Sequence, residues 1–136
     1  MSWLLDTNIV SELRKGERAN PGVRAWFAEA AEGSLFTSVL VVGELRCGIE
    51  SIRRRDVPSA LALELWLAEL TDGFADRILP VDREVAEQWG RLNVPDPVPT
   101  VDGLLAATAL VHGLTLVTRN TRDVARTGVQ LLDPTA

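Results

Sequence analysis

The sequence predicts an α/β fold: a short, mostly parallel sheet of about five strands flanked by helices. Short apolar segments alternate with segments of helical periodicity from one end of the 136 residues to the other. No internal repeat, low-complexity tract or linker divides the chain. The length and the 46% hydrophobic content suffice for one core without disulfides. We therefore expect a single domain spanning residues 1–136.

Strands are predicted where short apolar segments are bounded by polar, Gly or Pro residues. These segments are 2–5, 34–37, 78–81, 114–117 and 129–132. Between them, apolar residues recur every three or four positions, as on the buried face of a helix. Such stripes run through 23–31, 42–52, 63–70, 85–92 and 100–111.

Local residues mark several helix ends. Asp82 is a predicted N-cap, Gly113 a predicted stop, and the Pro-rich residues 94–99 a predicted loop. The apolar faces also carry the four tryptophans, which we expect in the core rather than as RNA-stacking platforms: Trp3, Trp26, Trp66 and Trp89.

Composition narrows the functional classes. The net charge of -5 argues against a broad basic surface for nucleic acid, although divalent cations can reverse the sign of an acidic cleft. Cys47 is the only cysteine, so neither an intramolecular disulfide nor a cysteine zinc cage can form, and we expect it to be packed. No apolar run is long enough for a membrane span or signal peptide, so we expect a cytoplasmic protein.

Three acidic positions are predicted to meet at one edge of the sheet. Asp6 follows the first strand, Asp102 lies in the first turn of a helix, and Asp123 lies in the segment after the fourth strand. The carboxyl ends of parallel strands share one edge, where open α/β sheets bind ligands. Each acid also has a structural interpretation, because Asp6 can cap a helix and Asp102 gains from the helix dipole. Thr7 or Asn8 is the alternative cap.

Glu44 interrupts the otherwise apolar stretch 39–45 on a predicted helix. A charge there needs either a partner, a metal or exposure to solvent. If Glu44 joins the other acids, their repulsion raises their pKa values unless cations bind. Mg²⁺ or Mn²⁺ is the natural occupant, because both prefer oxygen ligands and leave positions for water and phosphate.

Four segments in this order resemble PIN-domain ribonucleases, specifically toxins of the VapC type. They are Leu-Asp-Thr-Asn-Ile-Val-Ser-Glu-Leu at 5–13, the 38–48 segment ending Gly-Glu-Leu-Arg-Cys-Gly, the helix 102–113, and Leu-Val-Thr-Arg-Asn-Thr-Arg-Asp at 116–123. The resemblance covers nearly the whole chain. It implies a PIN-like three-layer sandwich, a Mg²⁺- or Mn²⁺-dependent endoribonuclease acting on RNA, a VapB-type antitoxin and a homodimer.

The resemblance assigns roles by position. Asp6, Glu44 and Asp102 match the most regular acids of the family. At the fourth place, Asn120 stands where many relatives carry an acid, so Asp123 supplies either the last metal ligand or an outer contact. Thr7, Asn8, Thr118 and Asn120 are expected to orient the ligands. The implied reaction is attack by a metal-activated water on the scissile phosphorus.

Other functions remain as alternatives. One is a non-catalytic PIN-like module whose acidic cleft docks a basic partner. Another is a phosphatase with Asp6 as nucleophile, but Asn8 stands where a second acid is wanted and Lys15, the only lysine, is too near in sequence. With His112 as the only histidine, a two-histidine ribonuclease is excluded. The arginines 53–55 end a predicted helix, either as dipole-complementing charges or as an RNA contact.

Overall fold

The computed structural model describes residues 1–135, in which five strands and seven α-helices alternate along the chain. Four short 3-10 turns complete the connections. The elements in chain order are β1 Trp3–Leu5, α1 Thr7–Leu13, α2 Pro21–Glu29, β2 Leu35–Ser38, α3 Val39–Arg53, α4 Val57–Phe74, β3 Ile78–Leu79, α5 Arg83–Leu92, α6 Thr100–His112, β4 Thr115–Val117, α7 Thr121–Val124 and β5 Leu131–Leu132.

The five strands form one sheet in the order β3-β2-β1-β4-β5, and every pair is parallel. Trp3 of the central strand pairs with Leu35 on one side and Thr115 on the other. All five predicted strands are therefore confirmed, in a sheet that is parallel throughout. The edge strands β3 and β5 have two residues each, shorter than predicted. Pro80 directly follows β3 and has no N–H with which to continue the ladder.

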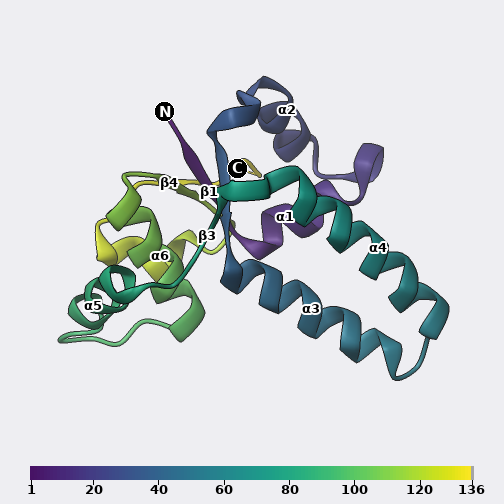
Figure 1. Cartoon of the computed structure of the whole chain (residues 1–136). Helices are drawn as coiled ribbons and strands as arrows, with labels where there is room; N and C mark the ends of the chain where they lie inside the picture. The colour runs from purple at the N-terminus through teal and green to yellow at the C-terminus, as the bar shows by residue number, and fades with distance from the viewer. Residues whose placement is uncertain (136) are drawn as a thin grey trace.

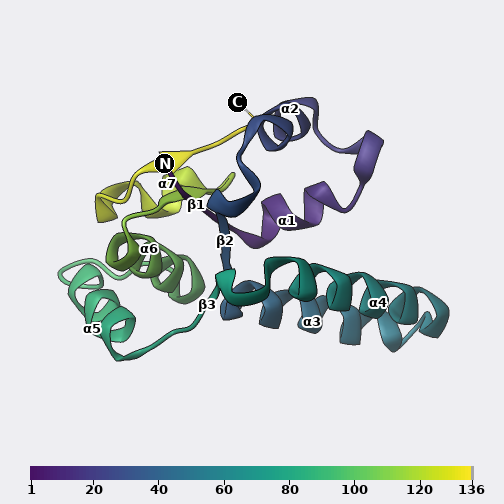
Figure 2. The ribbon, with the colours of Figure 1, turned by 45° about the horizontal axis from the view of Figure 1, so that its top comes forward.

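Helices cover both faces of the sheet. From β1 to β2 to β3 the chain moves toward one edge, and from β3 to β4 to β5 it crosses back and continues toward the other. Because such crossovers are right-handed, the two runs place their helices on opposite faces. Figures 1 and 2 show α5 and α6 on one side of the sheet, with α1, α3 and α4 on the other. The predicted α/β three-layer architecture is confirmed.

The core lies between the central strands and the helices that cross them. Leu4, Leu5 and Leu105 have no exposed surface, and Leu116 is almost as fully buried. Three of the tryptophans are partly buried against this core, and the rings of Trp3 and Trp26 meet edge to face at 5.5 Å. No helix within residues 1–135 combines the length and the apolarity needed to cross a membrane.

The expectation for Cys47 was wrong, because its side chain is exposed on α3. Helix α3 buries Val41, Leu45 and Ile49, which are spaced four residues apart on one face. Cys47 falls two positions after Leu45 and therefore on the opposite side of the helix.

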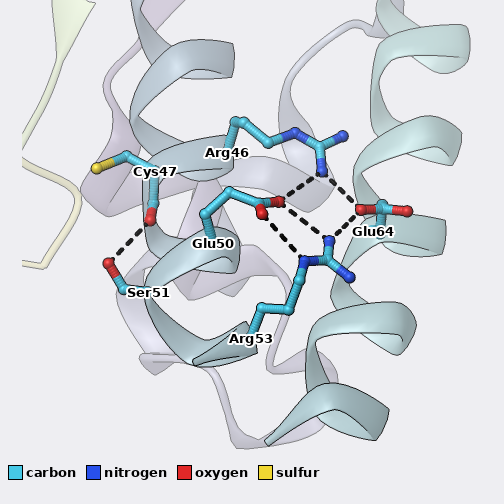
Figure 3. A network of polar contacts seen from close by, with 6 residues as sticks. All are labelled: Arg46, Cys47, Glu50, Ser51, Arg53 and Glu64. Carbon is cyan, nitrogen blue, oxygen red and sulfur yellow. Dashed lines mark hydrogen bonds and ion pairs between the residues drawn. The ribbon is translucent and has the colours of Figure 1, made fainter. Parts of the chain in front are cut away.

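Helices α3 and α4 pack side by side as a hairpin joined by a network of four charged residues (Figure 3). Arg46 lies 2.8 Å from Glu64 on α4 and 3.3 Å from Glu50 on its own helix. Arg53 bridges the same two glutamates. Half-exposed ion pairs of this kind are screened by water and contribute little to stability. Arg53 is therefore engaged between helices, while Arg54 and Arg55 are exposed at the end of α3.

Candidate metal-binding active site

The candidate site lies where β1 and β4 run next to each other at the middle of the sheet. The connections leaving these two strands lead to opposite faces, which opens a crevice at their carboxyl ends. Asp6 directly follows β1, and Thr118 directly follows β4. The backbone N–H of Asp6 donates to the carbonyl of Val117 at 3.0 Å, so the ladder continues into the site.

Asp6 is buried, with 5% of its surface exposed, and both of its carboxylate oxygens accept hydrogen bonds. Oδ1 accepts from the backbone N–H of Thr7 at 2.7 Å, which makes Asp6 the N-cap of α1. Oδ2 accepts from the Thr118 hydroxyl at 2.6 Å and the Asn8 amide at 3.3 Å. The alternative that Thr7 or Asn8 caps this helix was wrong, because Asp6 precedes both and takes the first free N–H.

Glu44 reaches the same crevice from α3. It is exposed, and its Oε1 accepts a hydrogen bond from the Thr7 hydroxyl at 2.5 Å. Thr7 thus connects two acids, through its backbone to Asp6 and through its side chain to Glu44. The charge of Glu44 in the apolar stretch 39–45 is therefore tolerated, because the side chain is exposed on the surface of α3 and has Thr7 as a polar partner.

The four acids form a single electrostatic cluster, which we call the acid cluster: Asp6, Glu44, Asp102 and Asp123. Burial raises the pKa of Asp102 above its usual value of 3.8, and the charges of the other three acids raise it further. Burial is also the largest cause that raises the pKa of Asp6, with a smaller contribution from Glu44, while its hydrogen bonds lower that pKa. The charges of the other three acids therefore reach Asp102, and that of Glu44 also reaches Asp6.

The donor set suits a hard divalent cation. In residues 1–135, no three acidic, histidine or cysteine side chains already converge on one point in the manner of a finished metal site. Mg²⁺ does not require such a cage, because it takes one or two carboxylates directly and keeps several waters. Clustered carboxylates with raised pKa values are the electrostatic condition that such an ion relieves. The residues present therefore fit Mg²⁺ or Mn²⁺.

Thr118 and Asn8 both donate hydrogen bonds to Asp6. The buried Thr118 hydroxyl donates to Asp6 and accepts from the Asn120 backbone N–H at 3.0 Å and from the Asn8 amide at 3.3 Å. Asn120 contributes its backbone N–H to this network, and the residue itself is exposed to solvent. Asp123 is also exposed, in the first turn of α7. Of the two candidates for the fourth position, Asp123 is the one whose charge reaches Asp102.

Two residues near the cluster were missed from the sequence as parts of the site. Glu12 on α1 is buried with 6% exposure, and it pairs with Arg119 in the loop after β4. In the sequence, Glu12 lies between Ile9 and Leu13, which both pack in or against the core. A carboxylate at such a position needs a partner, and this is the sequence signal that could have indicated the pair.

We predict that Asp102→Asn stabilises the metal-free protein at neutral pH. Folding raises the pKa of Asp102 above its usual value. The protonated carboxyl therefore contributes fully to stability at pH values below the usual pKa, and this contribution is lost as pH rises through the raised pKa. The asparagine side chain does not ionise in this range, so the stability of the variant does not fall for this reason as pH rises. Because Asp102 is partly exposed, water screening keeps the gain below about 1 kcal/mol.

The measurement is thermal unfolding in EDTA from pH 3 to 7. The melting temperature of the variant should rise above that of the unsubstituted chain only at the upper end. A constant difference across this range would contradict the prediction.

A cavity lies elsewhere, between α1, α2 and α4. It has a volume of about 570 Å³ and is mostly apolar, with Leu13, Phe27 and Leu70 among its lining residues. Leu5 and Val10 border it, so the cavity adjoins the strand and helix that carry Asp6, but no member of the acid cluster lines it.

A model of the PIN domain matches residues 3–129, which includes all four acids. The chain belongs to the PIN-domain family. This PIN domain is 31% identical over 139 residues to the VapC ribonuclease Y4jK of Sinorhizobium fredii, with 96% of each chain covered. It is 32% identical over 138 residues to the toxin FitB of Neisseria gonorrhoeae, again with 96% of each chain covered. The resemblance to VapC-type proteins is confirmed.

Solved structures agree with the fold of this PIN domain. The crystal structure of FitAcB from Neisseria gonorrhoeae superimposes with a TM-score of 0.88 at 30% identity, covering 97% of each chain. The structure of VapBC-1 from nontypeable Haemophilus influenzae superimposes with a TM-score of 0.72 and covers all of both chains. At 22% identity, the latter supports the fold alone.

Proposed function

We propose that this PIN domain is a Mg²⁺- or Mn²⁺-dependent endoribonuclease that acts in the cytoplasm as the toxin of a toxin–antitoxin pair. The observation that carries the proposal is the acid cluster beside the junction of β1 and β4, where burial and the charges of three other acids raise the pKa of Asp102. Support comes from the family and from the relatives named as a ribonuclease and a toxin. The whole chain then serves as one nuclease domain.

In this proposal, Asp6 and Asp102 are the direct metal ligands. Their carboxylates would hold Mg²⁺ or Mn²⁺, which would supply a water molecule of lowered pKa and a positive charge to offset that of the phosphate during hydrolysis. Glu44 is a further ligand or orients the attacking water, because it reaches the crevice from α3 and is solvent-exposed. Thr118 and Asn8 fix the direction of Asp6 through their hydrogen bonds to its Oδ2. Asp123 completes the negative field beside Asp102.

The same geometry weighs against the alternatives. For a phosphatase with Asp6 as nucleophile, Asn8 would have to act as the second acid, yet its amide donates to Asp6. A docking module for basic peptides needs exposed charge but no buried carboxylate with a raised pKa, and Asp6 is buried. Buried, perturbed acids in a crevice are typical of catalytic or metal sites.

The test is cleavage of RNA by the purified chain. We expect internal cuts with Mg²⁺ or Mn²⁺, none in EDTA, and recovery when either ion is restored. Mapping the ends of the products distinguishes endonucleolytic cuts from trimming. Cleavage that continues unchanged in EDTA would contradict the metal requirement, and the absence of cleavage with both ions on total cellular RNA would favour the docking module.

We further propose an antitoxin partner that reaches both the acid cluster and the neighbouring cavity. An arginine of such a partner complements the acidic crevice. The apolar cavity next to β1 and α1 accommodates apolar side chains of the same segment. The structure of FitAB bound to a DNA fragment, which is 28% identical to this chain, supports a partner of this kind.

Coexpression with the adjacent open reading frame tests this partner. Phe27, which is 40% exposed and lines the cavity, offers a variant that leaves the acid cluster intact. We expect Phe27→Asp to lose the co-purifying protein while RNA cleavage persists, and Phe27→Leu to keep it. Retention by both variants would place the partner elsewhere.

A homodimer, also expected from the resemblance, would be detected by light scattering at twice the 14.8 kDa mass of one chain.

A further inference from the structure

Glu12 lies outside the acid cluster, and its buried carboxylate pairs with two positively charged side chains. It lies on α1, within two turns of Asp6, and only 6% of its surface is exposed. Its Oε1 accepts from the guanidinium of Arg119, and its Oε2 lies 2.7 Å from the ammonium group of Lys15. A buried carboxylate is costly without such partners, so the pairing fixes where the Arg119 side chain lies.

Arg119 comes from the loop that builds the site. It stands between Thr118, which donates to Asp6, and Asn120, whose N–H donates to Thr118. Its own backbone N–H donates to Asn8 Oδ1 at 3.3 Å. The backbone of Arg119 is thus part of the support of Asp6, while its guanidinium is directed to Glu12 and is 40% exposed.

The position of this guanidinium matters because Arg119 directly follows Thr118, which donates a hydrogen bond to Asp6 of the acid cluster. Arginine pairs with carboxylates through two parallel hydrogen bonds, and it stays protonated at any working pH. The acid cluster contains four carboxylates in need of a counter-charge. The groups whose charges shift the pKa values of Asp6 and Asp102 are other acids, and Arg119 is not among them. A released Arg119 side chain would be drawn to the cluster and would compete with a metal ion.

We propose that Glu12 is a positioning residue that holds the Arg119 guanidinium away from the acid cluster and so keeps the cluster free for a divalent cation. The inference rests on the proposed function, since it assumes that the cluster binds such an ion. It assigns to Glu12 an effect on metal affinity that acts through Arg119 alone. Lys15, half exposed on the other oxygen of Glu12, has no part in it.

The test is Mn²⁺ binding to the full chain without RNA, measured by electron paramagnetic resonance of the free ion. We expect Glu12→Gln to raise the dissociation constant by about tenfold or more, the scale of lost outer-shell support. Adding Arg119→Gln to that variant should restore the affinity, because the competing cation is gone. Arg119→Gln alone should bind Mn²⁺ at least as tightly as the unsubstituted chain, and Lys15→Gln should bind it equally.

A role confined to holding the fold predicts the opposite pattern, in which the double variant binds Mn²⁺ no better than Glu12→Gln. That pattern would overturn the inference. Unchanged binding by Glu12→Gln, or weakened binding by Arg119→Gln alone, would overturn it as well. If Glu12→Gln fails to fold, which circular dichroism shows, weakened binding by Arg119→Gln alone still overturns the inference, and tighter binding supports it. If the unsubstituted chain binds no Mn²⁺, both this inference and the proposed function fail, whereas normal binding by Glu12→Gln overturns this inference alone.

Discussion

Asp6→Asn is expected to lower RNA cleavage by at least about a thousandfold, which corresponds to about 4 kcal/mol of lost transition-state stabilisation. The substitution removes the negative charge of the most buried acid in the cluster while its shape is kept. Asparagine is as good an N-cap as aspartate, so it can still accept from the Thr7 N–H. The fold should therefore survive, while the attraction for the cation is lost together with the hydrogen bonds that Oδ2 accepts from Thr118 and Asn8.

The measurement compares initial cleavage rates at saturating Mg²⁺ or Mn²⁺, with circular dichroism to confirm the fold. Asp72→Asn, on the exposed surface of α4, is the matched control and should cut at the normal rate. Cleavage by the Asp6 variant within tenfold of the unsubstituted chain would remove Asp6 from the catalytic mechanism.

The largest expected effect on stability comes from Leu105→Ala, at about 2–5 kcal/mol. Leu105 is fully buried on α6, one turn after Asp102, and belongs to the core beneath the site. Its removal leaves a cavity that a close-packed interior fills only partly. For a chain of this size, such a loss is a large fraction of the total folding free energy.

Urea unfolding of the metal-free protein measures this loss. Leu65→Ala is the control, because Leu65 on α4 is 70% exposed and the same truncation there should change the free energy of unfolding by less than about 0.5 kcal/mol. Equal effects of the two substitutions would contradict the assignment of Leu105 to the core.

The sequence predicted the order and type of the main elements because their apolar periodicity is strong. Gly113 ends α6 with a positive φ of 66°, and Asp82 caps α5 by accepting from Val85, both as expected. The lengths of β3 and β5 could not be predicted, because edge strands end where the pairing partner ends. The short helix α7 has four residues, too few for periodicity to be visible.

Three of the four acids were accessible from the sequence because they follow strand ends or lie at helix starts, and Glu44 was accessible because it interrupts an apolar stretch. Their partners were less accessible, since hydrogen bonds across the fold depend on side-chain direction. Asp6 meets Thr118 at a separation of 112 residues, and Thr7 meets Glu44 at 37. The pairing of Arg53 with Glu64 likewise requires knowing that α3 and α4 form a hairpin.

Anomalous diffraction from crystals of the chain grown with Mn²⁺ would show whether the acid cluster binds a divalent cation. We expect an anomalous peak within coordination distance of the carboxylates of Asp6 and Asp102, with the peak absent from crystals of Asp6→Asn. An ordered protein with no peak beside Asp6, or with Mn²⁺ bound only outside the acid cluster, would contradict it.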